Sequence, residues 1–267
     1  MIDVHHHCLP GVDDGPRDWA EAAELCAMAA EEGIETIVAT PHVLRGRWKN
    51  TSRDELRSLV DELNERTKGR PRILLGSEYY FAHDAADAVE SGAVTPLAGS
   101  RYVLIEFAAQ AIPPLVDQPL YRMQLGGWTP IIAHPERNLV FQHKPELLAS
   151  LIRLGARTQV TSGSLTGAFG PEAQKAATDW IRNGLVHIIA TDAHNPKRRP
   201  PIVREAIAAV AEIAGEALAD VLFHRNPAAV IEGRPLEYDP EPTLSSGNKG
   251  LMERLRGLFG YREKRTP

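Results

Sequence analysis

The sequence predicts an α/β protein built as a barrel of parallel strands with helices on its outside. Short apolar runs rich in β-branched residues alternate with longer amphipathic segments from residue 1 to about residue 235, and this alternation is typical of a parallel sheet. No glycine-rich phosphate turn follows the first run, although such a turn usually accompanies a doubly wound open sheet. The open sheet is therefore only the second choice.

Seven runs have the length and composition of buried strands. They are residues 2–4, 36–40 (TIVAT), 73–76 (ILLG), 102–107 (YVLIEF), 130–134 (PIIAH), 158–160 (TQV) and 186–192 (VHIIATD). Seven strand–helix repeats in one series predict a (β/α) barrel with seven strands in place of the usual eight.

Two amphipathic segments show how the helices are delimited. Residues 18–33 and 52–69 each carry helical periodicity and end at a glycine, a residue that favours the end of a helix. Thr51 or Ser52 is expected to cap the second helix.

Composition limits the class of protein. Of the 267 residues, 43% are hydrophobic and 24% charged, as in ordinary globular proteins, and the net charge of -5 argues against a nucleic-acid partner. We find no apolar run near the roughly 18 residues of a membrane span and no signal-peptide pattern. Two cysteines, Cys8 and Cys26, cannot form a disulfide framework, so we expect a cytoplasmic protein.

The chain is expected to divide into a barrel, residues 1–238, and a linker with a basic tail, residues 239–267. Residues 239–250 are rich in Pro, Ser and Gly, which is typical of a flexible connector. The tail places Leu251, Leu255 and Leu258 on one helical stripe beside several basic residues. It is predicted to be a frayed helix, a contact with another subunit in a homo-oligomer, or a weak contact with an anionic membrane.

Metal-binding side chains stand where the predicted strands end. In a barrel all these ends meet at one face, which carries the active site. The eight candidates from six strands are His5, His7, His42, Glu78, Glu106, His134, Asp192 and His194. A purification tag or a cluster of surface imidazoles would explain the opening triple histidine alone, but neither explains the other strand ends.

The local spacing supports a shared site. His5 and His7, like Asp192 and His194, are two residues apart, so each pair points to one side of an extended segment. His6 should then point away. Imidazole and carboxylate ligands without thiolate favour manganese, zinc or iron, and eight ligands are too many for one ion, so two or three are expected.

Such a cluster predicts the hydrolysis of a phosphate ester, because several divalent ions can activate water and neutralise phosphoryl charge. Arg137 follows His134 by three residues and Arg199 follows His194 by five, and guanidinium groups there would bind phosphate. A surface salt bridge is the alternative role for each arginine. Thiolate phosphatase chemistry is excluded because Asp14, not arginine, stands at the end of the loop after Cys8.

The segments DVHHHCLPGVDDG, TPH, GSE, IEF, AHPERN, TSGSLTGAFG and TDAHNPKRRP occur in this order along residues 1 to about 235. Together they resemble the polymerase and histidinol phosphatase (PHP) superfamily, and within it the bacterial manganese-dependent protein-tyrosine phosphatases of capsule and exopolysaccharide synthesis. The resemblance implies a distorted (β/α)₇ TIM-like barrel with a trinuclear centre, in which manganese is the first choice and iron, zinc or magnesium the alternatives.

The resemblance also implies roles for individual residues. His5, His7, Glu78 and Asp192 would hold one ion; Glu78, Glu106 and His134 a second; and Asp14, His42 and His194 a third. Arg137, Arg199 and Asp14 are the expected catalytic residues, and Asp13 is expected to cap the following helix. The implied substrate is the phosphorylated tyrosine-rich tail of a bacterial tyrosine kinase that controls polysaccharide export.

Some positions depart from the family pattern. His6 stands where many relatives have cysteine, and the loop after His42 contains Val43 and Trp48. Trp48 would flank a phosphotyrosine ring or pack the loop. The other candidate functions are a small-molecule phosphatase such as a histidinol phosphatase, a silent scaffold in polysaccharide export, and a proofreading exonuclease, which usually accompanies a polymerase domain.

Overall fold

The structure is a computed structural model, and it describes residues 1–244. Its strands are β1 (Ile2–His6), β2 (Thr36–Ala39), β3 (His42–Val43), β4 (Arg72–Leu75), β5 (Glu78–Tyr80), β6 (Tyr102–Glu106), β7 (Thr129–Ala133), β8 (Arg157–Thr161) and β9 (Ile188–Ala190). Its helices are α1 (Trp19–Glu31), α2 (Arg53–Thr67), α3 (Ala85–Glu90), α4 (Asp117–Leu125), α5 (Leu139–His143), α6 (Pro145–Arg153), α7 (Ser162–Leu165), α8 (Pro171–Arg182), α9 (Arg204–Ala214), α10 (Glu216–Asp220) and α11 (Asn226–Ile231). Three short turns are η1 (Leu97–Gly99), η2 (Pro135–Arg137) and η3 (Val221–Arg225).

The strands form two parallel sheets that continue one another. One sheet has the order β1-β2-β4 and the other the order β3-β5-β6-β7-β8-β9. Two residues separate β2 from β3, and two separate β4 from β5, so each pair is one strand path with an interruption. A parallel bridge between His6 and Ala193 brings the end of β1 beside the segment after β9. The strand paths thus follow one another in the order expected for a seven-stranded barrel.

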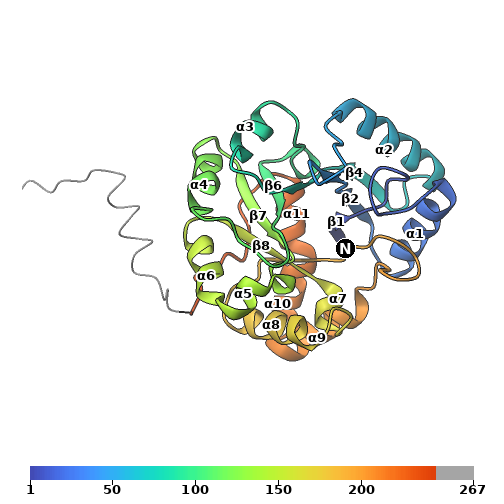
Figure 1. Cartoon of the computed structure of the whole chain (residues 1–267). Helices are drawn as coiled ribbons and strands as arrows, with labels where there is room; N and C mark the ends of the chain where they lie inside the picture. The colour runs from blue at the N-terminus through green and yellow to red at the C-terminus, as the bar shows by residue number, and fades with distance from the viewer. Residues whose placement is uncertain (245–267) are drawn as a thin grey trace, which may run out of the picture.

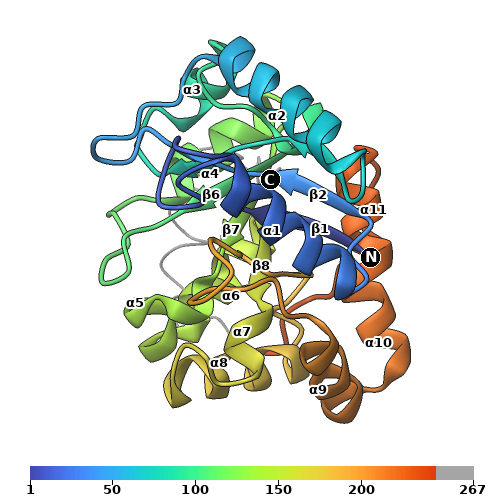
Figure 2. The same cartoon turned by 90° about the vertical axis from the view of Figure 1, so that its right-hand side faces the viewer.

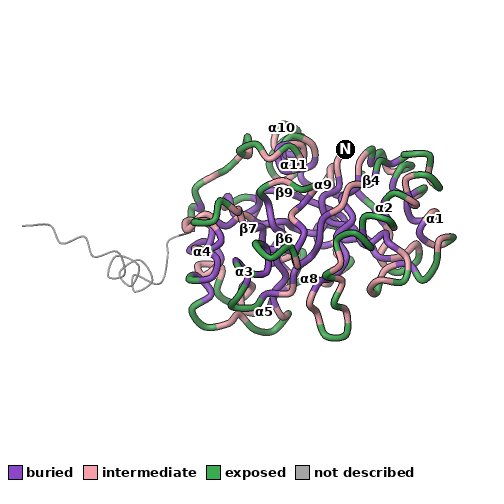
Figure 3. Tube along the Cα trace, turned by 90° about the horizontal axis from the view of Figure 1, so that it is seen from above, coloured by how far each residue is buried: buried purple, intermediate pink, exposed green. Residues whose placement is uncertain are grey.

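The helices surround the strands (Figures 1 and 2), and the buried apolar residues form two clusters. Viewed from above, buried chain runs through the middle of the molecule while exposed chain lies at its outside (Figure 3). The smaller cluster combines Val4 of β1, Val38 of β2, Leu104 of β6, Ile131 of β7 and Ile188 of β9. A larger cluster packs the helices against the outer faces of the strands.

The seven expected runs correspond to β1, β2, β4, β6, β7, β8 and β9, and the α/β class is confirmed. The short strands β3 and β5 were not expected. Helix α1 begins after Asp18, whose side chain accepts from the N–H groups of Ala20 and Glu21. Helix α2 begins after Ser52, so of the two candidate caps the serine holds this position.

Residues just beyond the predicted boundary at 238 contact the barrel. Asp239 pairs with Arg157 of β8, and the Thr243 N–H donates to the Asn183 carbonyl at 3.1 Å. The Arg153 Nη2 donates to the Pro242 carbonyl at 2.9 Å. The expected linker therefore begins with an ordered stretch, whereas the basic tail lies outside the described residues. Within residues 1–244, no helix is long and apolar enough to cross a membrane.

Candidate metal centre

Every ligand predicted from the strand ends, together with Asp14, lies in one cluster. Ligand atoms within 4.8 Å of one another form four overlapping groups: His7, Asp14, His42 and His194; His5, His134 and Asp192; His5, His7 and Glu78; and His42, Glu78 and Glu106. His6 is in none of these groups, in line with the expected alternation along β1. The nine residues come from widely separated segments, so the barrel topology creates the site.

Glu78 lies at the centre of the cluster. Its Oε1 is 2.8 Å from His134 Nε2 and 3.4 Å from His5 Nε2. Its Oε2 is 2.8 Å from His42 Nδ1 and 3.4 Å from His7 Nε2. One carboxylate thus contacts four imidazoles with both oxygens, which is the geometry of a carboxylate able to bridge two ions.

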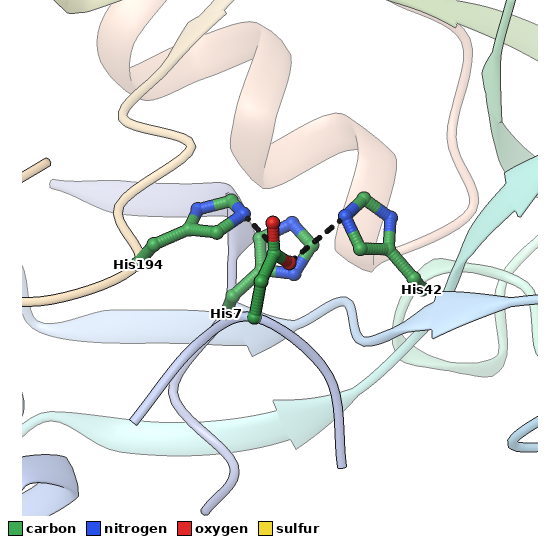
Figure 4. A group of neighbouring side chains, drawn as sticks. His7, His42 and His194 are labelled. Atoms are coloured by element: carbon green, nitrogen blue, oxygen red, sulfur yellow. Dashed lines mark ion pairs between the residues drawn. The ribbon is translucent and has the colours of Figure 1, made fainter. Parts of the chain in front are cut away.

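Asp14 lies between two imidazoles at the edge of the cluster. Its Oδ1 is 3.2 Å from His42 Nε2 and 3.4 Å from His194 Nε2. Figure 4 shows the rings of His7, His42 and His194 gathered in one place. Asp14 is partly exposed, in contrast to the buried histidines. This group matches the third ligand set implied by the family resemblance, with His7 added.

The other groups differ in detail from the implied sets. The geometry places His42 with Glu78 and Glu106, and His134 with His5 and Asp192, while His134 also contacts Glu78. Because His5, His7, His42 and Glu78 each belong to two groups, neighbouring ions would share ligands. The cluster has more ligands than one ion can use.

Two ligands adopt backbone conformations that side-chain-bearing residues rarely take. His134 has φ 32° and Asp192 has φ 52°, both in the left-handed region. The N–H of His134 donates to the Gln159 carbonyl at 2.7 Å, and the N–H of Asp192 donates to the His5 carbonyl at 2.8 Å. Backbone strain of this kind is held by its surroundings and is common at functional sites.

The carboxylates stay charged although they are buried. Burial by itself raises the pKa of Glu78, but the nearby His5 and His42 outweigh it and hold the pKa well below its ordinary value. The same holds for Asp192, where His5, Arg137 and Arg199 overcome burial. Glu106 differs, since burial and the charge of Glu78 raise its pKa to about 7.

The imidazoles fall into two kinds. Burial lowers the pKa of His134 to about 3, with Arg137 adding to the effect, and burial lowers that of His194 to about 4. Both are therefore neutral near pH 7, the form that binds a metal. For His42, the charge of Glu78 and the hydrogen bonds with Asp14 and Glu78 outweigh burial and raise the pKa to about 9.

Both predicted phosphate-binding arginines are at the cluster. Arg137, from η2, and Arg199 donate through Nη2 to the same atom, Oδ2 of Asp192. The other oxygen, Oδ1, faces His5 Nε2 at 3.2 Å. Asp192 therefore connects the ligands to the arginines. Among the described residues, neither arginine Nε has a hydrogen-bond partner, so each guanidinium keeps a free donor.

Two supporting residues were missed from the sequence. The carboxylate of Asp13 accepts from His7 Nδ1 at 2.8 Å and from the N–H groups of Gly15 and His42 at 2.9 and 3.1 Å. The prediction that Asp13 caps a helix is wrong, because Asp18 holds that position five residues further on. The side chain of Gln159 similarly contacts His5 Nδ1 at 2.7 Å through Oε1.

The loop after β3 also reaches the cluster. The Arg45 Nε is 3.1 Å from Glu106 Oε2, and its Nη1 is 2.5 Å from His42 Nε2. The Trp48 ring stacks on His42 with centroids 5.4 Å apart and planes 17° apart. The structure shows Trp48 packed against the candidate ligand His42, and its role beside a phosphotyrosine ring stays a prediction. Arg45 was not predicted, because an arginine in a polar loop has no distinguishing pattern.

A cavity of about 250 Å³ opens beside the cluster. Its lining includes Asp14, Glu106, Arg137 and Arg199, together with the apolar side chains of Phe107 and Phe141. The cavity thus combines the candidate ligands and two arginines with apolar side chains.

Neither cysteine belongs to the site. Cys8 and Cys26 are free and buried, and a hydrogen bond between them together with burial raises the pKa of the Cys8 thiol well above its ordinary value. A thiol in this state is a poor nucleophile. Cysteine chemistry remains excluded.

Comparison with known proteins decides the family. Residues 1–232 match the family described as capsular polysaccharide synthesis, CpsB/CapC. The chain belongs to the CpsB/CapC family. Its match covers the barrel and every residue of the cluster, so the resemblance inferred from the strand-end motifs is confirmed.

Relatives of this CpsB/CapC chain are named tyrosine-protein phosphatases. Tyrosine-protein phosphatase YwqE of Bacillus subtilis (strain 168) is 36% identical over 264 residues, covering 98% of this chain and 100% of that protein. Tyrosine-protein phosphatase CpsB of Streptococcus pneumoniae is 32% identical over 238 residues, covering 86% of this chain and 98% of that protein.

Solved structures agree with this placement. A structure from work on YwqE of Bacillus subtilis and CpsB of Streptococcus pneumoniae, described as metal-dependent tyrosine phosphatases, matches with TM-score 0.87 and 34% identity. It covers 92% of this chain and 100% of that chain. The lactonase Lmo2620 from Listeria monocytogenes shares the fold alone, with TM-score 0.54 at 13% identity.

Proposed function

We propose that this protein is a metal-dependent protein-tyrosine phosphatase. The observation that carries the proposal is the meeting of nine imidazole and carboxylate ligands with Arg137 and Arg199 beside one cavity. The relatives at 36% and 32% identity are named tyrosine-protein phosphatases.

The residues present fit divalent ions. Their donors are imidazole nitrogens and carboxylate oxygens, the set that manganese, iron and zinc accept. Within the described chain, the buried atoms Glu78 Oε2, Glu106 Oε2 and His194 Nε2 face ionisable side chains of the cluster and Arg45 but make no hydrogen bond of regular geometry, as expected of atoms that would coordinate a metal. We assign His5, His7, Asp14, His42, Glu78, Glu106, His134, Asp192 and His194 as ligands of two or three ions, with manganese the first choice.

When bound, such ions would polarise phosphoryl oxygens and make an attacking water more acidic. The chain itself supplies the rest. Arg137 and Arg199 bind the phosphate oxygens through guanidinium donors, and Asp192 keeps the two groups oriented toward the cavity. Asp14, partly exposed at the cavity, completes the catalytic set together with the arginines.

The leaving group suits this arrangement. Tyrosine leaves as a phenol with a pKa of about 10, far more acidic than an aliphatic alcohol. Cleavage of its phosphate ester therefore depends less on a dedicated general acid. Phe107, which lines the cavity and is not fully buried, offers apolar surface for the aromatic ring.

For the natural substrate we propose a phosphotyrosine-bearing tail of a bacterial tyrosine kinase that regulates capsule or exopolysaccharide synthesis. The support is the family description, which names capsular polysaccharide synthesis. A cytoplasmic site of action accords with this partner and with the two free thiols.

The test compares two substrates and one variant. Manganese-loaded full-length protein is assayed on a phosphotyrosyl peptide and on histidinol phosphate, and metal content is measured in parallel. We expect turnover of the peptide, a preference for it over histidinol phosphate, and loss of metal and activity in His134→Ala. A matched control is His224→Ala, because His224 lies on η3 outside the cluster. Full peptide turnover by His134→Ala would overturn the site assignment.

A further inference from the structure

The segment TSGSLTGAFG, residues 161–170, connects β8 to α8 and places an aromatic ring against both arginines. The centroid of the Phe169 ring is 4.6 Å from the Cζ atom of Arg137 and 5.7 Å from that of Arg199. Both distances are within the range of cation–π attraction, about 6 Å. One half-buried phenylalanine thus contacts two guanidinium groups that come from separate loops.

The same segment is fastened to the loop that carries Arg137. The Oε1 atom of Glu136 accepts from the Thr161 N–H at 3.0 Å and from the Ser164 hydroxyl at 2.7 Å. Glu136 is fully buried and directly precedes Arg137. Two hydrogen bonds therefore tie the first half of the segment that carries Phe169 to the residue beside Arg137.

Gly163 makes room for the ring. A Cβ atom placed on Gly163 would lie 3.0 Å from Cε2 of Phe169 and 3.4 Å from Cβ of Ala168. The first of these separations is much tighter than ordinary van der Waals contact, so any larger residue at position 163 would push the ring. The glycine in this segment is thus explained by the ring that packs on it.

The arginines need such support. Their Nη2 atoms donate to one oxygen of Asp192, so two cations are brought together at a single acceptor. Like charges this close repel one another. An aromatic face carries negative charge density, so the Phe169 ring attracts both guanidinium groups without occupying their hydrogen-bond donors. Their Nε donors have no partner within residues 1–244 and stay available to an oxyanion.

We propose that Phe169 is a positioning residue, which holds Arg137 and Arg199 together in the orientation that binds a phosphate group. The inference rests on the proposed function, since it takes phosphate as the anion that the arginines receive. It assigns the segment 161–170 the task of fixing the two arginines, in addition to their contacts with Asp192.

The test measures binding of inorganic phosphate by calorimetry to the full-length, manganese-loaded protein, with metal content checked for each variant. Phe169→Tyr keeps an aromatic face, whereas Phe169→Leu keeps apolar bulk without one. We expect Phe169→Leu to bind phosphate about five- to tenfold more weakly and Phe169→Tyr to stay within about twofold of the parent. Equal phosphate affinity in the leucine and tyrosine variants would show that the aromatic face does not matter and would overturn the proposal.

The variant Gly163→Ala tests the position of the Phe169 ring independently. Alanine favours a helix over glycine, so this change in α7 should leave the folded state intact while it displaces the ring. We expect phosphate affinity to fall with no loss of metal. Parent-like affinity in both Phe169→Leu and Gly163→Ala would overturn the proposal. Failure of the proposed function looks different, since the parent itself would then leave the phosphotyrosyl peptide intact.

Discussion

Asp13 offers a sharp test of how the cluster is held. Its buried carboxylate accepts from His7 Nδ1 at 2.8 Å, and the Nε2 atom of the same ring is directed at Glu78 and Asp192. A carboxylate can only accept, so it keeps the proton of neutral His7 on Nδ1 and leaves Nε2 free for a metal. Asp13→Asn places an amide N–H₂ or a single carbonyl oxygen at this position, and the amide N–H₂ orientation favours the wrong tautomer.

The size of the effect follows from similar contacts. Loss of a group that orients a metal-bound histidine costs about 10–100-fold in metal affinity, which corresponds to about 1.4–2.7 kcal/mol. Asp13→Asn also weakens the hydrogen bonds that the side chain accepts from the Gly15 and His42 N–H groups. We therefore expect a loss of manganese affinity near the upper end of this range. Manganese titration calorimetry measures the affinity, and phosphotyrosyl-peptide turnover should fall in parallel.

Asp18→Asn is the matched control. It removes the same charge five residues from Asp13, yet asparagine caps α1 as well as aspartate does. This variant should bind manganese like the parent. Parent-like affinity in Asp13→Asn would refute the reasoning that the Asp13 carboxylate orients His7.

Three further predictions concern the centre and the barrel. Glu78→Gln should lower turnover more than about 100-fold and lose bound metal, because Glu78 contacts four imidazoles. The exposed Glu62→Gln serves as the control in metal analysis and in the assay. Bound metal and turnover at the parent level in Glu78→Gln would contradict the bridging role. Removal of the metal ions with a chelator should lower the melting temperature measured by calorimetry by about 5–10 °C. A ligand at 100 times its Kd stabilises the folded state by about 2.7 kcal/mol. An unchanged melting temperature would mean that the ions contribute nothing to folding stability. Burial lowers the pKa of His187 below its ordinary value of 6.5. The unfolded chain therefore binds a proton at this imidazole more readily than the folded chain does. The free energy of unfolding should decrease as the pH falls below about 6.5. The drop in melting temperature between pH 7.5 and 5.5 should therefore be smaller in His187→Gln, and an equal drop would exclude this residue as its source.

The features predictable from sequence were those set by topology. Parallel strands in a barrel must end at one face, so residues such as His5, Glu106 and His134 could be brought together without coordinates. The short strands β3 and β5 were missed because they are two and three residues long and contain the ligands His42 and Glu78 themselves. Their polar residues hide the strand pattern.

The residues that were missed act through other side chains. Asp13 and Gln159 contact His7 and His5 from behind, and such contacts depend on how loops fold back. The aspartate was assigned to a helix cap because it precedes α1 in sequence, but the Pro-Arg segment after Gly15 moves the start of α1 to Asp18. Sequence position alone could not distinguish these two hydrogen-bonding roles.

The cluster also shows where the fold gives up stability for binding. For Glu78, Asp192 and Asp14, burial opposes the charged state, and the charge is kept only by nearby imidazoles or arginines. Hydrogen bonds among protein groups do not fully replace the lost water, since the buried Glu106 Oε2 has an ion-pair contact with Arg45 but no hydrogen bond of regular geometry within residues 1–244. Buried charges that are neutralised this incompletely lower the stability of the fold, but the same charges attract cations. The same imbalance explains why metal binding and folding stability should rise and fall together in this protein.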